Sequence, residues 1–222
     1  MVGYVVKIVA SVYLTHDVKQ ISVEKPKGYT FISGKTTMLA INKPGWEDKF
    51  RPFTFTSLNK WDRLEFIIKC YREHNGVTKE LEKLREGDEL IMQNPWGYLA
   101  FQGKGVFIAG GTGITPFISI FRQLQEDKKL AGNSLIFSNK TSEDVILKEE
   151  LERLLGDDFH SIFTRENVIG FRDRRIDEHL LKELVKDFNQ HFYICGSESF
   201  VRDIQAILLG LGVAAHSLVI EK

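Results

Sequence analysis

The hydrophobic period of the sequence changes near Gly103. After this residue, short apolar runs alternate with longer segments whose apolar residues recur at helical spacing. The first run, residues 106–109, leads through a glycine turn into a segment with apolar residues at Ile114, Phe117 and Phe121. Further runs lie at residues 135–137, 161–163, 192–195 and 217–220. The alternation predicts a parallel sheet with helices on both faces and a ligand crevice at the carboxyl ends of its strands.

Residues 2–102 carry a different pattern, in which short β-type runs are separated by turn residues. The runs lie at residues 5–12, 37–41, 53–56, 64–69 and 90–92, with one helical segment at 78–84. Such spacing predicts a small antiparallel barrel. A chain of 222 residues suits two domains of about 100 residues each. We therefore predict a β-barrel domain at residues 1–103 and an α/β domain at residues 104–222.

The composition narrows the classes of function. Thirty basic residues balance 30 acidic ones, so no attraction to nucleic acid or to acidic membranes is expected. The longest apolar stretch, residues 207–211, is far shorter than the ~18 residues of a membrane span, and the chain starts without a signal-like segment, so a cytoplasmic protein is expected. Cys70 and Cys195 are too few for a disulfide framework, a cysteine-based zinc site or a four-thiolate cluster. Redox chemistry would therefore need a borrowed cofactor, and no metal is expected.

A glycine-rich turn, residues 110–116, joins the first strand of the second half to its helix. Backbone N–H groups at a helix N-terminus can hold a pyrophosphate. The turn departs from the G-x-G-x-x-G fingerprint, because Pro116 stands where the third glycine would be. Taken alone, the segment is equally consistent with a tight strand-to-helix turn.

Three other segments carry groups suited to ligands, and each also has a plain structural interpretation. Cys195-Gly196 ends a strand at the carboxyl edge, although a buried cysteine is usually only a small apolar residue. Residues 51–57 place a cation, an aromatic and hydroxyls along one strand, which could simply be amphipathic. Residues 74–78 form a polar loop into a helix, with Thr78 as a candidate N-cap.

Taken in chain order, the four segments resemble the ferredoxin–NADP reductase family, which includes flavodoxin reductases and NAD(P)H-flavin reductases. The resemblance spans essentially the whole chain. It implies a ferredoxin reductase-type FAD-binding barrel followed by an NAD(P)-binding domain. It also implies an oxidoreductase that moves electrons between NAD(P)H and a separate acceptor, by hydride transfer between nicotinamide C4 and flavin N5.

The resemblance assigns the flavin contacts residue by residue. Arg51 corresponds to the family's arginine at the flavin pyrophosphate, Phe53 to the aromatic that stacks on the ring, and Thr54 to the hydroxyl at N5. Phe53 keeps the stacking face of the usual tyrosine but lacks its hydroxyl. The remaining matches, for the strand beside the ring and for the FAD phosphates, are Ile67, Lys69, Gly76, Val77 and Thr78.

The resemblance likewise assigns the nicotinamide nucleotide. Cys195 and Gly196 match the segment that flanks nicotinamide C4, so Cys195 joins Thr54 as an expected catalytic residue. Glu221 is a further candidate, for proton relay, although a carboxylate so near the terminus is more often simply solvated. The nucleotide-binding turn is matched by Gly111, Thr112, Gly113, Thr115 and Pro116.

NADPH is expected as the donor, with NADH as the alternative. Ser138 and Lys140 follow the second strand of the α/β half, and Thr164 and Arg165 follow the third. A 2′-phosphate needs such cations and hydroxyls, whereas NAD sites usually place an acidic residue after the second strand. The Thr-Arg-Glu run also resembles the Ser-Arg-Glu of NADP-dependent members. Ordinary surface charges are the competing interpretation of Lys140 and Arg165.

Two expectations concern what meets the flavin from outside. Many members end on a glutamate, a spacer and an aromatic that covers the second flavin face, whereas this sequence ends at Glu221-Lys222. We therefore expect that face to be open or covered by another chain. Flavodoxin or ferredoxin is the expected acceptor, helped by a cationic rim of Lys35, Lys43, Lys49 and Lys69.

Several alternatives stay open at this point. Free flavin could replace the protein acceptor. The chain could instead be a non-catalytic FAD-binding electron-transfer subunit of a larger complex, which turnover by the isolated chain would exclude. A plain nucleotide-binding α/β protein without flavin would give a colourless preparation.

Overall fold

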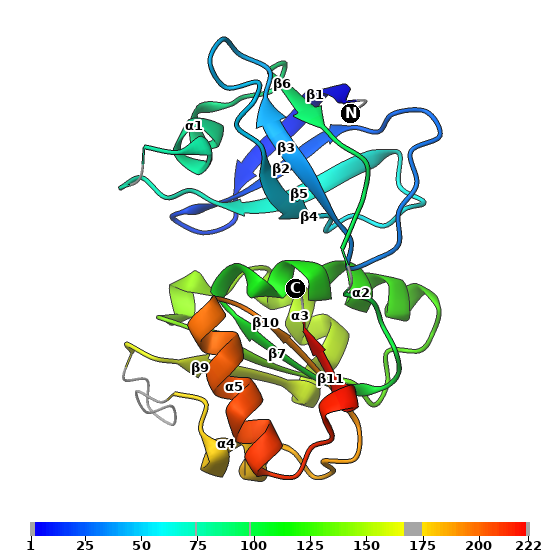
Figure 1. Ribbon diagram of the computed structural model, residues 1–222, viewed down its shortest axis with the longest axis vertical. Coiled ribbons are helices and arrows are strands. Elements are labelled where there is room, and N and C mark those ends of the chain that lie inside the picture. The colour runs from blue at the N-terminus through cyan, green and yellow to red at the C-terminus, as the bar shows by residue number, and fades with distance from the viewer. Residues whose placement is uncertain (1–2, 74, 98, 167–174, 221–222) are drawn as a thin grey trace.

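The computed structural model describes residues 3–73, 75–97, 99–166 and 175–220. Two β-sheets, one from each half of the chain, lie one above the other, with helix α2 between them (Figure 1). The strands of the first sheet lie between Tyr4 and Met92, and those of the second between Gly105 and Ile220. The two-part arrangement agrees with the predicted change of period, while the domain division at residues 103 and 104 stays a prediction.

The first sheet is a nearly closed antiparallel barrel with the strand order β4-β3-β6-β1-β2-β5. Beyond β4, an isolated bridge between Phe55 and Phe66 and a 2.9 Å hydrogen bond from the Thr56 N–H to the Glu65 carbonyl bring its two edges together. The six strands are β1 (Tyr4–Tyr13), β2 (Val18–Glu24), β3 (Thr36–Ile41), β4 (Arg51–Thr54), β5 (Arg63–Lys69) and β6 (Glu89–Met92). The antiparallel barrel predicted from the sequence is confirmed.

Strand β2 is the element that the sequence pattern missed. Lys19 interrupts its apolar pattern, yet this lysine is only 6% exposed. Its ammonium donates to the carbonyls of Glu82 and Leu84, at 2.9 and 3.0 Å, where helix α1 (Val77–Lys83) ends. A buried cation that caps helix carbonyls looks like a surface charge in the sequence.

The second sheet is parallel throughout, with the order β11-β10-β7-β8-β9. Its strands are β7 (Gly105–Gly110), β8 (Ser134–Asn139), β9 (Phe159–Phe163), β10 (His191–Cys195) and β11 (Leu218–Ile220). Its helices are α2 (Thr115–Glu126), α3 (Lys148–Leu155), α4 (Glu178–Leu184) and α5 (Glu198–Gly210). Short 3-10 turns are η1 (Gly111–Ile114), η2 (Ser142–Asp144), η3 (Gly156–Asp158) and η4 (Ala215–Ser217).

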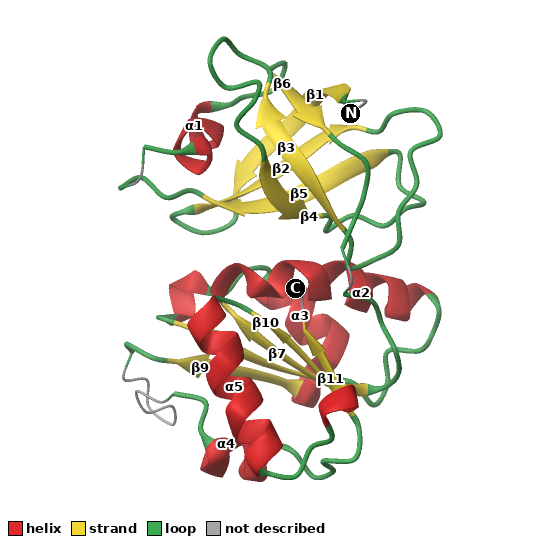
Figure 2. Cartoon of the chain, in the orientation of Figure 1, coloured by secondary structure: helices red, strands yellow, loops and turns green. Residues whose placement is uncertain are grey.

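Helices cover both faces of this sheet, as predicted (Figure 2). On one face, Phe107 of β7 packs edge-on against Phe117 and Phe121 of α2, with ring centroids 5.0 and 4.6 Å apart. On the other face, Ile108 shares a buried cluster with α4 and α5. Because the chain leaves β7 toward β8 and later returns to β10 on the other side, the carboxyl ends of these three strands form a topological switch point, where α/β folds bind ligands.

Helix α2 joins the two sheets. Val18, Ile67 and Leu99 of the first half share one buried cluster with the apolar face of α2. The Gly34 N–H also donates to Ser119 Oγ at 3.0 Å. Within the described ranges, no helix combines the length and the apolar character that crossing a membrane requires.

Candidate functional site

The glycine turn lies at the switch point, between β7 and α2. Gly111 has a φ of +54°, and a Cβ built on it would meet no atom within 4 Å, so the turn is open on that side. The Thr115 hydroxyl donates to the Thr112 carbonyl at 3.0 Å, which fixes the transition into the helix. Pro116 lies in the first turn of α2. Backbone N–H groups have no intrahelical acceptor there, so the N–H that proline lacks is not needed. Backbone N–H groups are thus presented at a helix start, as an anion requires.

Gly113 brings this turn against the end of β10. A Cβ on Gly113 would lie 2.6 Å from the backbone N of Gly196, and closer still to the Cys195 carbonyl. Glycine is therefore required for the two segments to touch. Gly196 is itself covered by the ring of Phe200, which would be 2.6 Å from an added Cβ. The turn and Cys195-Gly196, two segments predicted separately from the sequence, thus touch in the structure.

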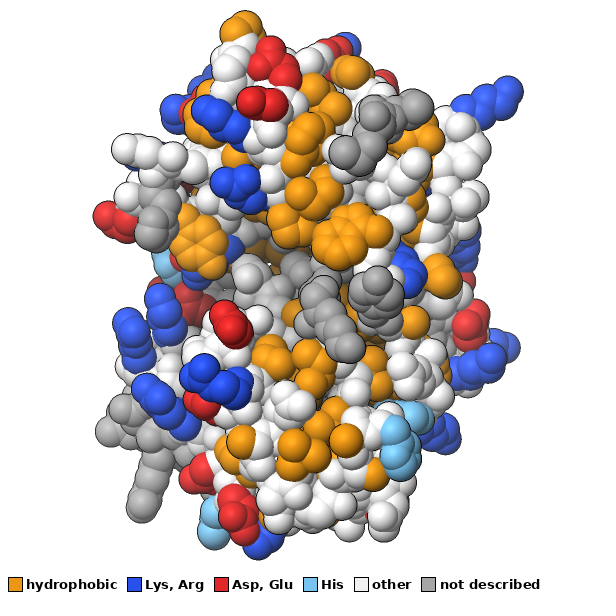
Figure 3. All heavy atoms as spheres, viewed as in Figure 1, with side chains coloured by type: hydrophobic (Ala, Val, Ile, Leu, Met, Phe, Trp, Pro, Cys, Tyr) orange, Lys and Arg blue, Asp and Glu red, His pale blue; other side chains and the backbone are white. Residues whose placement is uncertain are grey.

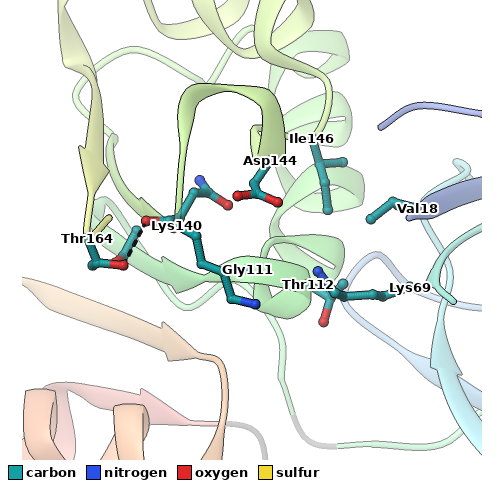
Figure 4. Close-up of a pocket in the computed structure, with 10 residues that line it drawn as sticks. Val18, Lys69, Gly111, Thr112, Lys140, Asp144, Ile146 and Thr164 are labelled. Atoms are coloured by element: carbon teal, nitrogen blue, oxygen red, sulfur yellow. Dashed lines mark hydrogen bonds between the residues drawn. The ribbon is translucent and has the colours of Figure 1, made fainter. Parts of the chain in front are cut away.

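A cavity of about 200 Å³ opens beside the turn, between the barrel and the α/β half (Figure 4). Val18 and Lys69 line it from the barrel, and Gly111 and Thr112 line it from the turn. Its other walls are formed by Ser138, Asn139, Lys140, Asp144, Ile146 and Thr164. Figure 3 shows that the surface is hollowed between the two halves of the molecule, with apolar side chains bordering the hollow.

One buried polar group in this cavity's wall lacks a partner. Asn139 is 5% exposed, and its Nδ2 has no hydrogen-bond acceptor. A buried amide without an acceptor costs about 1–3 kcal/mol, and this amide nitrogen is itself covered, so it does not face the cavity. The open glycine turn and Lys140, which line the same cavity, fit a dinucleotide.

A second cavity of about 320 Å³ continues from the first along the carboxyl edge. Ser138, Lys140 and Thr164 line both cavities. The second one adds two exposed cations, Arg165 and Arg175, and ends on Ile176, Ser199, Phe200, Asp203 and Ile204. The four residues predicted for NADP thus lie together. Sequence reasoning missed Arg175, which only the fold brings beside Arg165.

Glu166 follows Arg165 directly, yet its carboxylate is engaged elsewhere. Its Oε1 accepts from the Ser142 hydroxyl at 2.9 Å, and its Oε2 from the Ser142 backbone N–H. This contact ties the loop after β9 to the turn η2. Among the residues described as lining the second cavity, Asp203 is the one acid.

The flavin residues predicted on β4 lie at an edge of the barrel sheet. Arg51 is exposed and donates from Nη1 to the Phe50 carbonyl at 2.8 Å. Phe53 is half-buried, and Thr54 is 9% exposed with its hydroxyl 3.2 Å from that of Thr36. A cation, an aromatic ring and a hydroxyl therefore follow one another along the strand, and their exposure falls from Arg51 to the buried Thr54.

The other predicted flavin contacts lie further along the barrel. The Ile67 side chain is buried in the cluster shared with α2, and Lys69 forms a 2.7 Å ion pair with Asp17. Helix α1 begins at Val77, with Gly76 as its N-cap, rather than at Thr78. The Val77 side chain packs in the barrel core, so this segment can offer a ligand its backbone and the Thr78 hydroxyl.

The remaining predictions divide into those that the structure qualifies and those outside the described residues. Of the rim lysines, Lys69 is paired as above and Lys43 pairs with Asp88 at 3.0 Å, so the expected cationic rim is partly neutralised. Glu221 lies outside the described residues, as does the end of the chain.

His16, Asp17 and Asp144 bring ligand atoms within 4.8 Å of one another. However, Asp17 pairs with Lys69, and Asp144 accepts from Thr141.

Comparison with known proteins gives a family for the second half. The family model described as "Oxidoreductase NAD-binding domain" matches residues 107–206. The chain is 29% identical to NADH-cytochrome b5 reductase 2 of Candida albicans, over 89% of this chain and 71% of the relative. It is 34% identical to NADH-cytochrome b5 reductase 1 of Arabidopsis thaliana, over 67% of this chain and 56% of the relative.

Solved structures share the whole architecture. The ferredoxin NADP+ reductase of Neisseria gonorrhoeae, solved with bound FAD and NADP, superposes with a TM-score of 0.85 at 24% identity and covers 98% of this chain and 97% of its own. The cytochrome b5 reductase domain of Ulva prolifera nitrate reductase gives a TM-score of 0.83 at 20% identity, over 99% of this chain and 97% of its own. Both similarities bear on the fold, including the order of barrel and parallel sheet.

Proposed function

We propose that the chain, which belongs to the ferredoxin–NADP reductase family of NAD-binding oxidoreductases, reduces a barrel-bound FAD with NADPH. It then passes the electrons to a separate one-electron carrier. Its general class is that of a flavin-dependent NAD(P)H oxidoreductase. The observation that carries the proposal is the contact of the glycine turn with Cys195-Gly196. The same turn lines the cavity between barrel and sheet with Gly111 and Thr112.

The barrel residues supply binding and orientation. These residues would hold FAD, which would supply hydride and electron-transfer chemistry when bound. In our proposal, Arg51 neutralises pyrophosphate charge and the Phe53 ring offers a stacking face. Thr54 holds a hydroxyl at the flavin edge, where the neighbouring Thr36 hydroxyl at 3.2 Å orients it.

The α/β half orients the nicotinamide nucleotide. The turn residues Thr112 to Thr115 would bind its pyrophosphate through backbone N–H groups. Lys140, which lines the same cavity, would meet the negative charge of the ligand. Cys195 and Gly196 would border the nicotinamide ring, and their contact with Gly113 keeps the ring end and the pyrophosphate end of the site in fixed relation.

The choice of NADPH rests on the second cavity. Lys140, Arg165 and Arg175 surround it, and they supply the positive charge that a 2′-phosphate needs. β8 is followed by Lys140, whereas an NAD site usually has an acidic residue at that point. The relatives carry NADH in their names, so the proposal predicts a difference in donor between this chain and those relatives.

The donor preference can be tested with matched charge variants. Arg165→Gln and Arg175→Gln are each expected to lower kcat/KM for NADPH at least tenfold, because a hydrogen bond to a charged group contributes about 1.5–3 kcal/mol. The value for NADH should stay nearly unchanged. Arg153→Gln, at an exposed position of α3 that lines neither cavity, is the control. Equal use of both donors by the wild type, unaffected by either substitution, would refute the proposal.

For the acceptor, we propose a cytochrome b5-like haem protein, with flavodoxin or ferredoxin as the second candidate. The names of the relatives support the first. The partial neutralisation of the lysine rim removes part of the argument for a strongly acidic flavodoxin. Steady-state turnover should be measured with cytochrome b5, flavodoxin, ferredoxin and free flavin. The proposal predicts the highest kcat/KM for cytochrome b5, and a higher value for any of the others would contradict it.

A further inference from the structure

A buried guanidinium joins the two halves of the molecule beside the proposed cofactor sites. Arg122 on α2 has a side chain only 11% exposed. Its Nη1 donates to the Thr56 carbonyl at 2.8 Å and to Glu65 Oε1 at 2.7 Å. Its Nε and Nη2 donate to the two carboxylate oxygens of Glu150 at 2.6 and 2.7 Å. Four hydrogen bonds thus connect α2 with the barrel and with α3.

The barrel side of this network is fixed by further hydrogen bonds. Glu65 is 7% exposed, and its Oε1 also accepts from the Thr56 hydroxyl at 2.7 Å. Its backbone N–H donates to Ser57 Oγ at 3.1 Å, and the Gln20 amide donates to its other oxygen. Arg122 also lies 5.2 Å from the centroid of the Trp61 ring. A bidentate guanidinium in such surroundings defines an orientation as well as a contact.

The network connects the strands that carry the proposed flavin contacts with the helix that begins at the nucleotide-binding turn. Thr56 is two residues beyond Thr54, and Glu65 is two residues before Ile67 on β5. Arg122 is about two turns, or roughly 10 Å, along α2 from Thr115. One side chain therefore contacts elements that carry both proposed cofactor sites.

Docking of α2 on the barrel has other supports. The Gly34 N–H bonds to Ser119 Oγ, and an apolar cluster from both halves surrounds the helix. At the exposed end of the same interface, Lys60 forms an ion pair with Glu126. What Arg122 adds to these contacts is a directional constraint in the buried part of the interface.

We infer that Arg122 is a positioning residue, which sets the spacing between the flavin-binding strands and the nucleotide-binding turn through Thr56, Glu65 and Glu150. This inference rests on the proposed function. Reaction rates depend steeply on the alignment of reacting atoms, and a displacement of about 1 Å can lower a rate about 100-fold. Loss of the constraint should therefore lower the rate of flavin reduction and leave the affinity for each cofactor nearly intact.

The test uses Arg122→Lys, which keeps the charge but cannot form the bidentate pair with Glu150. Glu126→Gln, which breaks the exposed ion pair on the same helix, is the matched control. Three quantities are measured: binding of FAD and of NADP+, the single-turnover rate of flavin reduction at saturating NADPH, and amide hydrogen exchange of residues 55–66 in the flavin-free protein. Exchange reports on the interface without any turnover.

For Arg122→Lys we expect both affinities to stay within about twofold of the wild type, the single-turnover rate to fall at least tenfold, and exchange in residues 55–66 to accelerate. Glu126→Gln should change none of these. An unchanged rate and unchanged exchange in folded Arg122→Lys would overturn the inference, as would a loss confined to nucleotide affinity.

Two further outcomes are also decisive. If Arg122→Lys does not fold, Glu150→Gln takes its place, because it weakens the bidentate pair while Arg122 keeps Thr56 and Glu65; the same rate and exchange results are then required. If neither NADPH nor NADH reduces the wild type, the proposed function fails. Faster exchange in the variant would still support the structural constraint, and unchanged exchange would overturn that as well.

Discussion

Replacing Gly113 by alanine tests the contact on which the site depends. Gly113 is buried in η1, and an added Cβ would lie 2.6 Å from the Gly196 nitrogen, with the Cys195 carbonyl closer still. Backbone atoms at the end of β10 cannot rotate away as a side chain could. The turn or the strand end must therefore move by about 1 Å to restore a van der Waals separation of about 3.5 Å.

The expected magnitude follows from this displacement. An extra methyl in a packed interior lowers the free energy of unfolding by about 1–3 kcal/mol. This displacement would move the pyrophosphate end of the site relative to the nicotinamide end, so the rate of flavin reduction should fall about 100-fold. Urea denaturation measures the first quantity, and anaerobic stopped-flow absorbance at saturating NADPH measures the second.

Gly212→Ala provides the comparison. Gly212 has a φ of +87° and no atom within 4 Å of an added Cβ, so its substitution introduces backbone strain without a clash. It should lower the free energy of unfolding by about 1–2 kcal/mol and leave flavin reduction unchanged. If Gly113→Ala matched the wild type in both stability and rate, the contact between the turn and β10 would not have the role argued here.

Three further predictions address single side chains. Thr54→Ala should slow flavin reduction about tenfold, or about 1.4 kcal/mol, whereas Thr54→Ser should not; a fast alanine variant in single-turnover kinetics would refute the role at N5. Tyr193→Phe should lower the free energy of unfolding, measured in urea, by about 1–3 kcal/mol, because the buried hydroxyl accepts from the Gln102 and Gly103 N–H groups at 2.8 and 3.0 Å; no loss would show that these groups find other partners. Burial raises the pKa of the Cys70 thiol to about 11, so the native protein should react slowly with iodoacetamide at about pH 8.5, where an exposed thiol is half ionised. The part of the free energy of unfolding that depends on neutral Cys70 should likewise be lost as the pH rises from about 8.5 toward the folded-state pKa. Labelling of the native protein as fast as in urea would contradict the raised pKa of Cys70.

The parts of the fold that could be predicted from sequence are those with local causes. The glycine turn between a buried strand and an amphipathic helix is determined within a few residues, and so is the alternation that defines the parallel sheet. Strand β2 was missed in the sequence pattern because the burial of Lys19 depends on carbonyls at the end of α1, far along the chain. Lys19 therefore interrupts the apolar pattern of the strand, although the folded protein satisfies its buried ammonium.

The site shows the same division. Ser138, Lys140, Thr164 and Arg165 could be grouped in advance, since strand ends of a parallel sheet share one edge. Arg175 could not, because nothing local marks it as a neighbour of Arg165. Arg122 reads in sequence as one more charge on a helix surface, and only the crossing of α2 over the barrel shows that it is buried between two carboxylates.

Whether the protein carries a flavin that NADPH reduces is shown by the visible absorption spectrum of the purified protein. The spectrum is recorded before and after anaerobic addition of NADPH and, on a fresh sample, of NADH. We predict flavin bands in the protein as isolated, or after supply of FAD, that bleach rapidly with NADPH and more slowly with NADH. A protein that binds no flavin when FAD is supplied, or whose bound flavin neither nucleotide reduces, would contradict the proposed function.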